Sequence, residues 1–238
     1  VHSIDPCSTC FKHLTRDCHL EIFMNIAISN NIFSSLQAFR LLFLMCAIVA
    51  DLDIDDDDEE EDNPLNVCEF IIGNIDRICA FITELPFTPS DVSASELLIG
   101  VIPAMDEIPD TIYNTAKFFF EMMFKYPHHS ELHLCCYRLF GALVEKDSNV
   151  FDRVDIRPKI IEAYQIYKDD CQCVFWGHLH ELTKFVTKLN PKTECPGWNE
   201  YLENVYRKKE RLISQPYGGS VPKNMPRDPN FLNNIDIF

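Results

Sequence analysis

Apolar residues recur every three to four positions through most of the chain. That period is typical of amphipathic helices, whereas the alternation at every second position that would indicate half-buried strands is rare. The pattern predicts an all-α protein of about eight or nine helices, among them single helices over 63–85 and 149–168. The stripes expected to face the core are Ile112, Ala116, Phe119 or Phe120 and Met123; Leu132, Cys136, Leu139 and Leu143; Ile156, Ile160, Ala163 and Tyr167; and Phe175, Leu179, Leu182, Val186 and Leu189.

Turn and capping residues predict where several of these helices begin and end. Asn63-Pro64 can start one helix, because asparagine caps a helix N-terminus and proline suits the first helical position. Ser93 and Glu96 have the spacing of a capping box before a short apolar helix. Tyr126-Pro127 ends another helix, and Ser130 is expected to cap the one that follows.

The second of two helices expected over residues 20–50 is apolar on nearly every face. A helix of this kind is expected to be buried on both sides, as in a layered array. Its longest uninterrupted apolar run, residues 41–50, falls well short of the roughly 20 residues that cross a bilayer, so we expect no membrane span. The side chains that cover its faces include Phe33, Leu36, Phe39, Leu41, Leu42, Phe43 and Leu44.

The spacing of the helices favours a repeat array. Helix pairs recur at roughly 40 residues, which is the period of HEAT and armadillo arrays. We predict one HEAT/armadillo-like domain over 20–213, interrupted by an acidic loop at 51–62 and preceded by a ragged segment at 1–19. Residues 214–238 are rich in proline and glycine and predict an irregular tail. An array of this kind presents an extended surface suited to binding other proteins.

The formal net charge of the chain is −16. This balance speaks against nucleic acid as the main partner, because neutralising phosphates needs clustered Lys and Arg, and it disfavours anionic membranes. Residues 51–62 hold ten Asp or Glu in twelve positions, which predicts a solvated loop. The run lacks the spaced ligands and the turning glycine of an EF-hand, so a basic docking partner is a stronger alternative than calcium.

The eleven cysteines are scattered through helical stripes rather than set in a disulfide framework. Buried free thiols behave as small apolar side chains, so the sequence favours a reducing compartment, the cytoplasm and also the nucleus. The alternative is a zinc site built on Cys7, Cys10, His13, Cys18 and His19, since the first two form a C-x-x-C pair. No second C-x-x-C accompanies that pair.

Two further groups contain residue types that bind metals: His128, His129 and His133, and Cys171, Cys173, His178 and His180. Pro127 places the first two histidines in a turn, where adjacent side chains point in different directions. On a helix from Val174, His178 and His180 lie about 200° apart and cannot share one metal. The sequence contains no G-x-S-x-G, H-E-x-x-H or glycine-rich phosphate loop. We therefore expect no enzyme activity, no cofactor and no metal site.

Four short signatures stand in a fixed order between Phe118 and Leu212. In this order they resemble the SAPS-domain family, which comprises regulatory subunits of protein phosphatase 6-type, 2A-like serine/threonine phosphatases. The resemblance begins at about Phe118, and nothing comparable precedes it. The signatures are Phe124-Lys125-Tyr126 with Leu132-His133; the block Val150–Tyr164, which ends in Glu162-Ala163-Tyr164; Gly177-His178-Leu179; and Trp198-Asn199-Glu200-Tyr201.

The chain departs from the family pattern at several of these positions and is similar to a divergent member. Ser130-Glu131 replaces the usual asparagine pair, and Tyr164 replaces a tryptophan. His180 stands where threonine is usual, and Leu182-Thr183-Lys184 replaces isoleucine-alanine-asparagine.

The resemblance implies a non-catalytic regulatory or scaffolding subunit. Its partner would be a 2A-like, protein phosphatase 6-type catalytic subunit, with room for a further regulatory subunit, and the catalytic metals would lie in that partner. The alternative is a helical-repeat adaptor unrelated to phosphatases, acting in trafficking or transport. The signature residues are either contacts to the partner or residues that keep the fold, and the pattern leaves both open.

Three signature residues carry local expectations of their own. His133 stands at the third position of a helix capped by Ser130, where its imidazole can bond a backbone N–H group or a turn carbonyl. His178 lies on the rim of a core face and is expected to be a satisfied core residue or an inter-helix hydrogen-bond partner rather than a metal ligand. Gly177 lowers helix stability and is tolerable if a neighbouring helix comes close.

Overall fold

The computed structural model describes residues 9–50, 66–84, 86–168, 173–189 and 195–214. Within these residues every regular element is a helix and no strand occurs, which confirms the predicted all-α helical array. The chain divides into two compact units, residues 1–198 and residues 199–238.

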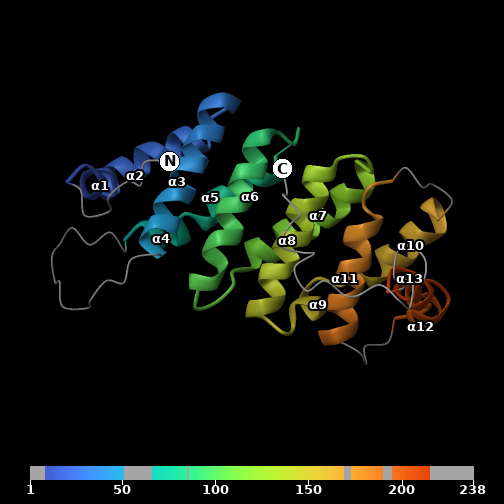
Figure 1. The fold of residues 1–238 in the computed structure, drawn as a ribbon. Coiled ribbons are helices and arrows are strands. Elements are labelled where there is room, and N and C mark those ends of the chain that lie inside the picture. Colours follow the sequence, from blue (N-terminus) through green and yellow to red (C-terminus); the bar gives the residue numbers. More distant parts are fainter. Residues whose placement is uncertain (1–8, 51–65, 85, 169–172, 190–194, 215–238) are drawn as a thin grey trace, which may run out of the picture. The chain divides into compact units, whose positions relative to one another are not determined.

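The first unit begins with six α-helices and a short 3₁₀ turn (Figure 1). They are α1 (Thr9–Leu14), α2 (Asp17–Ala27), α3 (Ile32–Ala50), α4 (Asn66–Gly73), α5 (Ile75–Thr83), α6 (Pro89–Val101) and η1 (Ile102–Ala104). The expected start of a helix at Asn63-Pro64 lies outside the described residues, and so does the acidic run 51–62.

The remaining helices continue the series. They are α7 (Asp110–Lys125), α8 (Ser130–Lys146), α9 (Val150–Arg153), α10 (Arg157–Tyr167), α11 (Trp176–Leu189) and α12 (Trp198–Tyr201). The described part of the second unit continues from α12 through the π-helical turn η2 (Leu202–Tyr206) into α13 (Arg207–Ile213). At the other end of the chain, α1 and the start of α2 lie within the segment 1–19 that was expected to be ragged.

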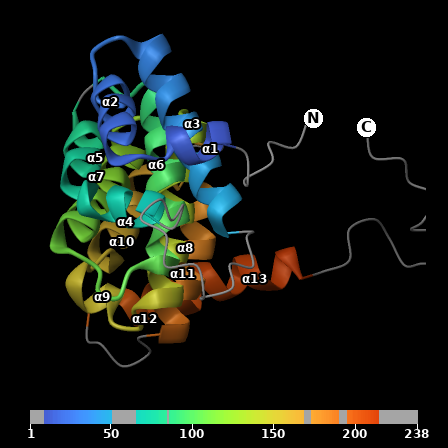
Figure 2. The ribbon, with the colours of Figure 1, turned by 90° about the vertical axis from the view of Figure 1, so that its left-hand side faces the viewer.

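The helices of the first unit pack in an overlapping series (Figures 1 and 2). α3 lies against α2 and α6, α6 against α5 and α8, and α8 against α7 and α11. Because α3, α6 and α8 each pack against at least two other helices, one apolar core runs through the unit. Its largest side chains are Phe39, Phe119, Phe140, Phe151 and Phe175, none of them more than 1% exposed.

The predicted core stripes of α7, α8, α10 and α11 are confirmed. Their side chains are buried because spacings of three and four residues return to one face of a helix. Only Tyr167 and Leu189, at the ends of α10 and α11, are half-buried. The fully buried members of these stripes include Ile112, Ala116, Leu132, Leu139, Leu143, Ile160, Leu182 and Val186.

The expectation that α3 is buried on both sides is wrong. One half of the helix, with Phe39, Leu42 and Met45, is buried, whereas Phe33 is 74% and Leu44 53% exposed. Periodicity shows where apolar side chains lie on a helix, but not how many neighbours the fold supplies to cover them. By length and composition alone, residues 32–49 are apolar enough to cross a membrane, and 39% of them are buried in this structure.

Two helices that the sequence predicted as continuous are broken. The helix expected over 63–85 is interrupted at Asn74, whose side-chain amide donates to the Phe70 carbonyl oxygen at 2.9 Å. This side-chain bond competes with the helical ladder, as short polar side chains commonly do. The helix expected over 149–168 stops at Arg153 and restarts at Arg157, because Pro158 is tolerated in a first turn but not in a helix interior.

The capping box predicted at Ser93 and Glu96 lies elsewhere. Ser93 and Glu96 are inside α6, which begins instead with Thr88 as its N-cap. The Asp91 carboxylate accepts hydrogen bonds from the Thr88 N–H group at 2.5 Å and from the Thr88 hydroxyl at 2.6 Å. Both sites have a capping-box pattern, and Pro89, which suits a first helical turn, follows Thr88 directly.

Candidate functional site: a groove between α7 and α10

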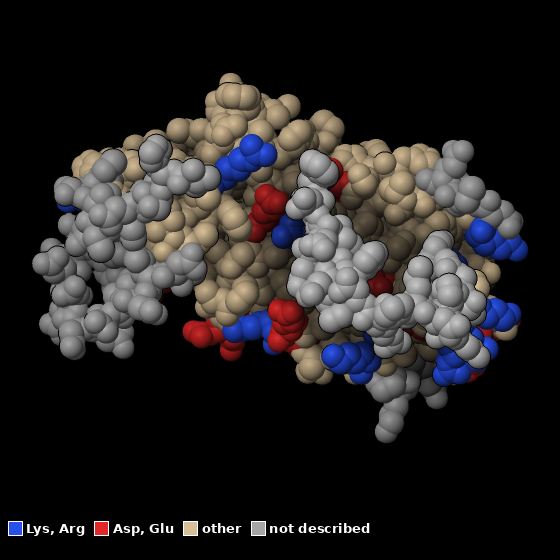
Figure 3. Space-filling view, in the orientation of Figure 1, with Lys and Arg blue, Asp and Glu red and all other residues tan. Residues whose placement is uncertain are grey.

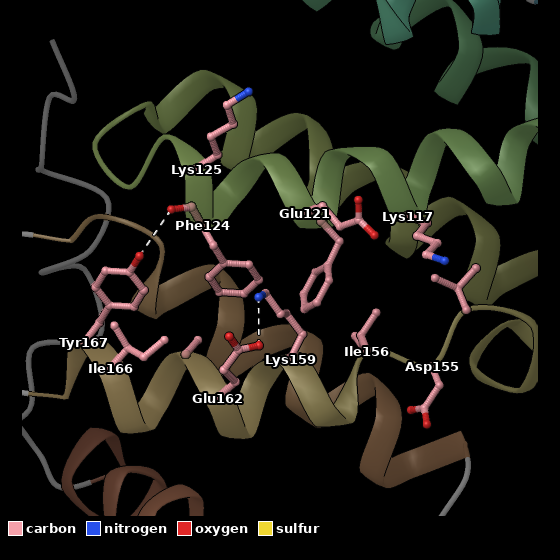
Figure 4. Close-up of a pocket in the computed structure, with 13 residues that line it drawn as sticks. Lys117, Glu121, Phe124, Lys125, Asp155, Ile156, Lys159, Glu162, Ile166 and Tyr167 are labelled. Carbon is pink, nitrogen blue, oxygen red and sulfur yellow. Dashed lines mark hydrogen bonds and ion pairs between the residues drawn. The ribbon is translucent and has the colours of Figure 1, made fainter.

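A groove of about 520 Å³ lies between α7 and α10 (Figure 4). Phe120 and Phe124 of α7 line it together with Ile156, the N-cap of α10, and Ala163 of α10, so part of its inner surface is apolar. The Tyr167 hydroxyl donates to the Phe124 carbonyl oxygen at 3.4 Å and links the two helices at one end of the groove. The groove is therefore part of the packed array rather than a gap between independent pieces.

Charges of both signs border this apolar surface. Lys159 Nζ lies 2.7 Å from Glu162 Oε2 and 5.8 Å from the centroid of the Phe124 ring. Lys117 and Glu121 line the groove from α7, and neither forms an ion pair within the part of the chain that the structure describes. Elsewhere on the face drawn in Figure 3, Lys and Arg are likewise interspersed with Asp and Glu. Apolar walls with mixed charges at the edge suit a protein segment better than a polymer of one charge sign.

Four of the signature positions line this one groove: Phe124 and Lys125 from α7, and Glu162 and Ala163 from α10. Phe124 is 8% and Ala163 1% exposed, so these two hold the walls in place. Lys125 and Glu162 are exposed at the edge, and in Figure 4 the Lys125 side chain points away from α10. Lys125 Nζ lies 5.6 Å from the centroid of the Tyr126 ring. A partner that filled the groove and extended past the end of α7 would reach both exposed side chains.

An aromatic cluster packs against Phe124, which lines the groove. The Phe124 ring lies 5.5 Å from that of Phe175, which lies 5.9 Å from the imidazole of His133. His133 in turn lies 6.4 Å from His178, whose ring is 5.7 Å from that of Tyr137. Edge-to-face and tilted contacts at these distances are favourable between aromatic rings. The cluster brings together two of the four signatures, through Phe124 and His133 of the first and His178 of the third.

His133 of α8 forms a hydrogen bond to the residue that ends α7. It is fully buried, and its Nε2–H group donates to the Tyr126 carbonyl oxygen at 2.9 Å, which confirms the expected bond to a turn carbonyl. Burial lowers the pKa of His133 below its usual value. The expected Ser130 cap is wrong: His129 is the N-cap, and its Nδ1 accepts from the Leu132 N–H group at 3.3 Å.

His178 and Gly177 lie side by side in the first turns of α11. The Nδ1 atom of His178 is buried and has no hydrogen-bond partner among the described residues, so the inter-helix bond expected of this side chain is not made at that atom. Burial lowers its pKa as well. Gly177 is exposed, and a Cβ atom placed there would have no neighbour within 4 Å. No helix approaches Gly177 within the described structure, and the glycine lies in the first turn of α11.

The remaining signature residues belong to the packing of the array. Leu132 and Leu179 are buried, and Tyr164 is half-buried with its ring 6.5 Å from that of Trp176. Trp198 is 5% exposed and ends the first unit, while Tyr201 belongs to the second unit and is 9% exposed.

Three sets of possible metal ligands were weighed from the sequence, and the structure describes only part of them. No group of three or more His, Cys, Asp or Glu side chains in the described residues is placed to hold a metal ion. Cys7 and Cys171 lie outside those residues. Burial raises the pKa of Cys135 to about 12, which keeps this core thiol protonated. Cys68 differs, because a hydrogen bond with Cys46 lowers its pKa to about 7.

Sequence reasoning missed three residues that complete the site. Lys159 was not singled out, although its spacing from Glu162 is that of a helical ion pair. Phe175 and Tyr167 were assigned only to core stripes. Phe175 is in fact the centre of the aromatic cluster, and Tyr167 bridges two helices. Their roles depend on which helices become neighbours, which no local pattern specifies.

No protein-family model matches the chain, and no curated protein or solved structure is significantly similar to it. Its function is therefore inferred from the groove and from the signature segments themselves.

Proposed function

We propose that this protein is a non-catalytic regulatory or scaffolding subunit of the cytoplasm and nucleus. It binds the catalytic subunit of a 2A-like, protein phosphatase 6-type serine/threonine phosphatase and directs that enzyme to substrates. One observation carries the proposal: four positions of the SAPS-like signatures, from segments far apart in sequence, line a single groove. The resemblance supplies the identity of the partner, and the groove supplies the surface.

The groove has the physical character of a protein-binding site. Its apolar walls can take the anchor side chains of a partner, and its charged edge can set the partner's register. On α7, Lys117, Glu121 and Lys125 follow one another at intervals of four residues, which places them in one row along the helix. None of the three forms an ion pair with a described residue, so all three charges are available to a partner.

The buried signature residues act on this surface indirectly. His133 holds the Tyr126 carbonyl, and the Phe124 carbonyl accepts from Tyr167. Both bonds fix the last turn of α7, where Lys125 lies. Loss of either bond is expected to shift the groove edge as well as to lower stability, whereas a change at Lys125 alters only the contact.

The proposal is tested by measuring binding between purified phosphatase 6-type catalytic subunit and the immobilised 238-residue chain. Lys125→Glu and Glu162→Lys reverse the two exposed signature charges. Lys188→Glu is the matched control, because Lys188 is exposed on α11 and does not line the groove. We expect both groove variants to bind the catalytic subunit at least about tenfold more weakly than wild type. Loss of a close charge pair at an interface has an effect of this size. The control and all melting temperatures should remain unchanged.

The outcomes separate the two parts of the proposal. If the wild-type chain does not bind the catalytic subunit, the phosphatase assignment fails. If wild type binds and both charge reversals bind equally well, the partner uses another surface and the groove assignment fails.

A further inference from the structure

The outer half of α3 is a mostly apolar surface that the described structure covers only in part. Phe33 and Leu44 are 74% and 53% exposed, and Ile32, which precedes them, is 51% exposed. The helix lies near one end of the first unit (Figures 1 and 2), and the surface over its first turns is largely uncharged in Figure 3. We call this surface the outer face of α3; its residues are Phe33, Leu36, Gln37, Arg40, Leu41, Leu44, Ala47 and Ile48.

An uncovered face of this composition is unusual. Single exposed apolar side chains are normal on soluble proteins, but a contiguous stripe marks an interaction site. The opposite half of α3 is already buried, with Phe39 and Leu42 fully inaccessible and α2 and α6 packed against the helix. The helix is thus held in place by its inner half, and the outer half is free to contact another molecule.

Arg40 is the only charged residue on the outer face of α3. It is exposed and forms no ion pair or hydrogen bond with a described residue. Leu44 follows it by one helical turn and Phe33 precedes it by two, so a molecule that covered the stripe would also cover the guanidinium. Burying that charge without a partner is costly, and a carboxylate in hydrogen-bonding geometry offsets the cost. The covering molecule must therefore bring an acidic group to this point.

We propose that the outer face of α3 binds an amphipathic helix of a partner protein whose apolar stripe is interrupted by one Asp or Glu that pairs with Arg40. The face extends over 16 residues from Phe33 to Ile48, about 22 Å along the helix, which matches four turns of a second helix. Rows of side chains spaced by three and four residues accept the ridges of another helix, as they already do on the inner half.

The charges favour a partner protein over a second copy or a bilayer. Two copies bring together two net charges of −16, and a twofold axis through Arg40 would oppose two guanidinium groups. An anionic bilayer is repelled by the same net charge, and Arg40 would lie in the middle of its contact surface. This surface is separate from the α7–α10 groove, and the proposal does not depend on the phosphatase assignment.

The probe for this surface is a phage-displayed library of 18-residue helical peptides. Apolar residues occupy one stripe, and the central stripe position is randomised among Glu, Gln and Lys. Selection uses the full-length chain, and the enriched peptides are then measured by fluorescence anisotropy against three variants. Leu44→Asp disrupts the apolar stripe, Arg40→Glu reverses its charge, and Ile166→Asp is the control at a 61% exposed apolar position of α10.

We expect enrichment of Glu at the central position and at least tenfold weaker binding to Leu44→Asp and Arg40→Glu. Arg40→Glu should instead prefer the Lys version of the same peptide, and Ile166→Asp should bind like wild type. The proposal would be overturned if no peptide is enriched, if Glu is not preferred at the central position, or if Ile166→Asp weakens peptide binding as much as Leu44→Asp does. Two other results would also overturn it: a wild-type dimer in light scattering that Leu44→Asp abolishes, or flotation of wild type with phosphatidylcholine vesicles that Leu44→Asp abolishes.

Discussion

The imidazole rings of His133, which is fully buried, and His178, which is half-buried, lie 6.4 Å apart between α8 and α11. Burial lowers the pKa of both side chains, and each also lacks a hydrogen-bond partner at Nδ1 within the described structure. A proton added to either ring would place a charge in an apolar cluster beside a second imidazole. Both rings are therefore neutral in the folded protein at neutral pH.

The first prediction is that acidification destabilises the fold through these two histidines. Their pKa values are lowered from 6.5 in the folded state, so the unfolded state binds protons first as the pH falls. Stability is fully present above about pH 6.5 and is lost below it, at up to about 1.4 kcal/mol per pH unit for each histidine. The measurement is urea denaturation between pH 7.5 and pH 5.

The matched variants for this prediction replace His133 and His178 by glutamine, which does not titrate. The glutamine amide at position 133 can still donate to the Tyr126 carbonyl. The double variant should lose most of the pH slope between 7 and 5, while the exposed control His128→Gln should keep it. Equal slopes in all three proteins would mean that other groups control the acid response.

The second prediction concerns the start of α6. Asp91 is 3% exposed, and its carboxylate holds both the N–H group and the hydroxyl of Thr88. Asp91→Ala removes the acceptor for these two Thr88 groups at the start of α6 and should lower the free energy of unfolding by about 1–2 kcal/mol. Ser93→Ala, at the cap position that the sequence suggested, should cost nothing, since alanine favours a helix interior. The stability change of each variant is measured from its denaturation midpoint at constant m-value. A larger loss of stability for Ser93→Ala than for Asp91→Ala would contradict the assignment of Thr88 as the N-cap.

The third prediction uses two glycines in different backbone conformations. Gly141 lies inside α8 with no atom within 4 Å of an added Cβ, so Gly141→Ala should stabilise by about 0.5–1 kcal/mol. Gly197 has φ +80°, a left-handed conformation that leads into Trp198. Gly197→Ala should destabilise by about 1–2 kcal/mol, because a Cβ is disfavoured there even though space is available. Thermal melts that shift in the same direction for both variants would refute this assignment.

The fourth prediction separates a structural from a contact role among the signature residues. Trp198 is 5% exposed, so Trp198→Ala should cost about 3–5 kcal/mol and weaken phosphatase binding only as a consequence. Lys125→Glu should do the reverse, with an unchanged melting temperature and weaker binding. Both proteins are compared by thermal melting and by binding to the catalytic subunit. A Trp198→Ala protein that melts like wild type but no longer binds would make the tryptophan a contact residue.

Local sequence determined the helical class and most of the core. The stripe Leu132, Cys136, Leu139 and Leu143 is fully buried because side-chain spacing alone defines which face of a helix avoids water. The bond from His133 to a turn carbonyl was also accessible from sequence, since it follows from the position of the residue in a first turn. Such features depend on residues within about two helical turns of one another.

Only the tertiary structure decided the groove and the outer face of α3. Phe124 and Glu162 line one groove because α7 and α10 lie side by side, and nothing within either segment specifies that neighbour. Likewise, the apolar residues of α3 predicted burial on both sides, but the fold packs helices against one side and leaves Phe33 and Leu44 exposed. Hydrophobicity measures the tendency of a side chain to leave water, whereas burial also requires a partner surface, and the packing of distant segments alone decides whether the chain provides one.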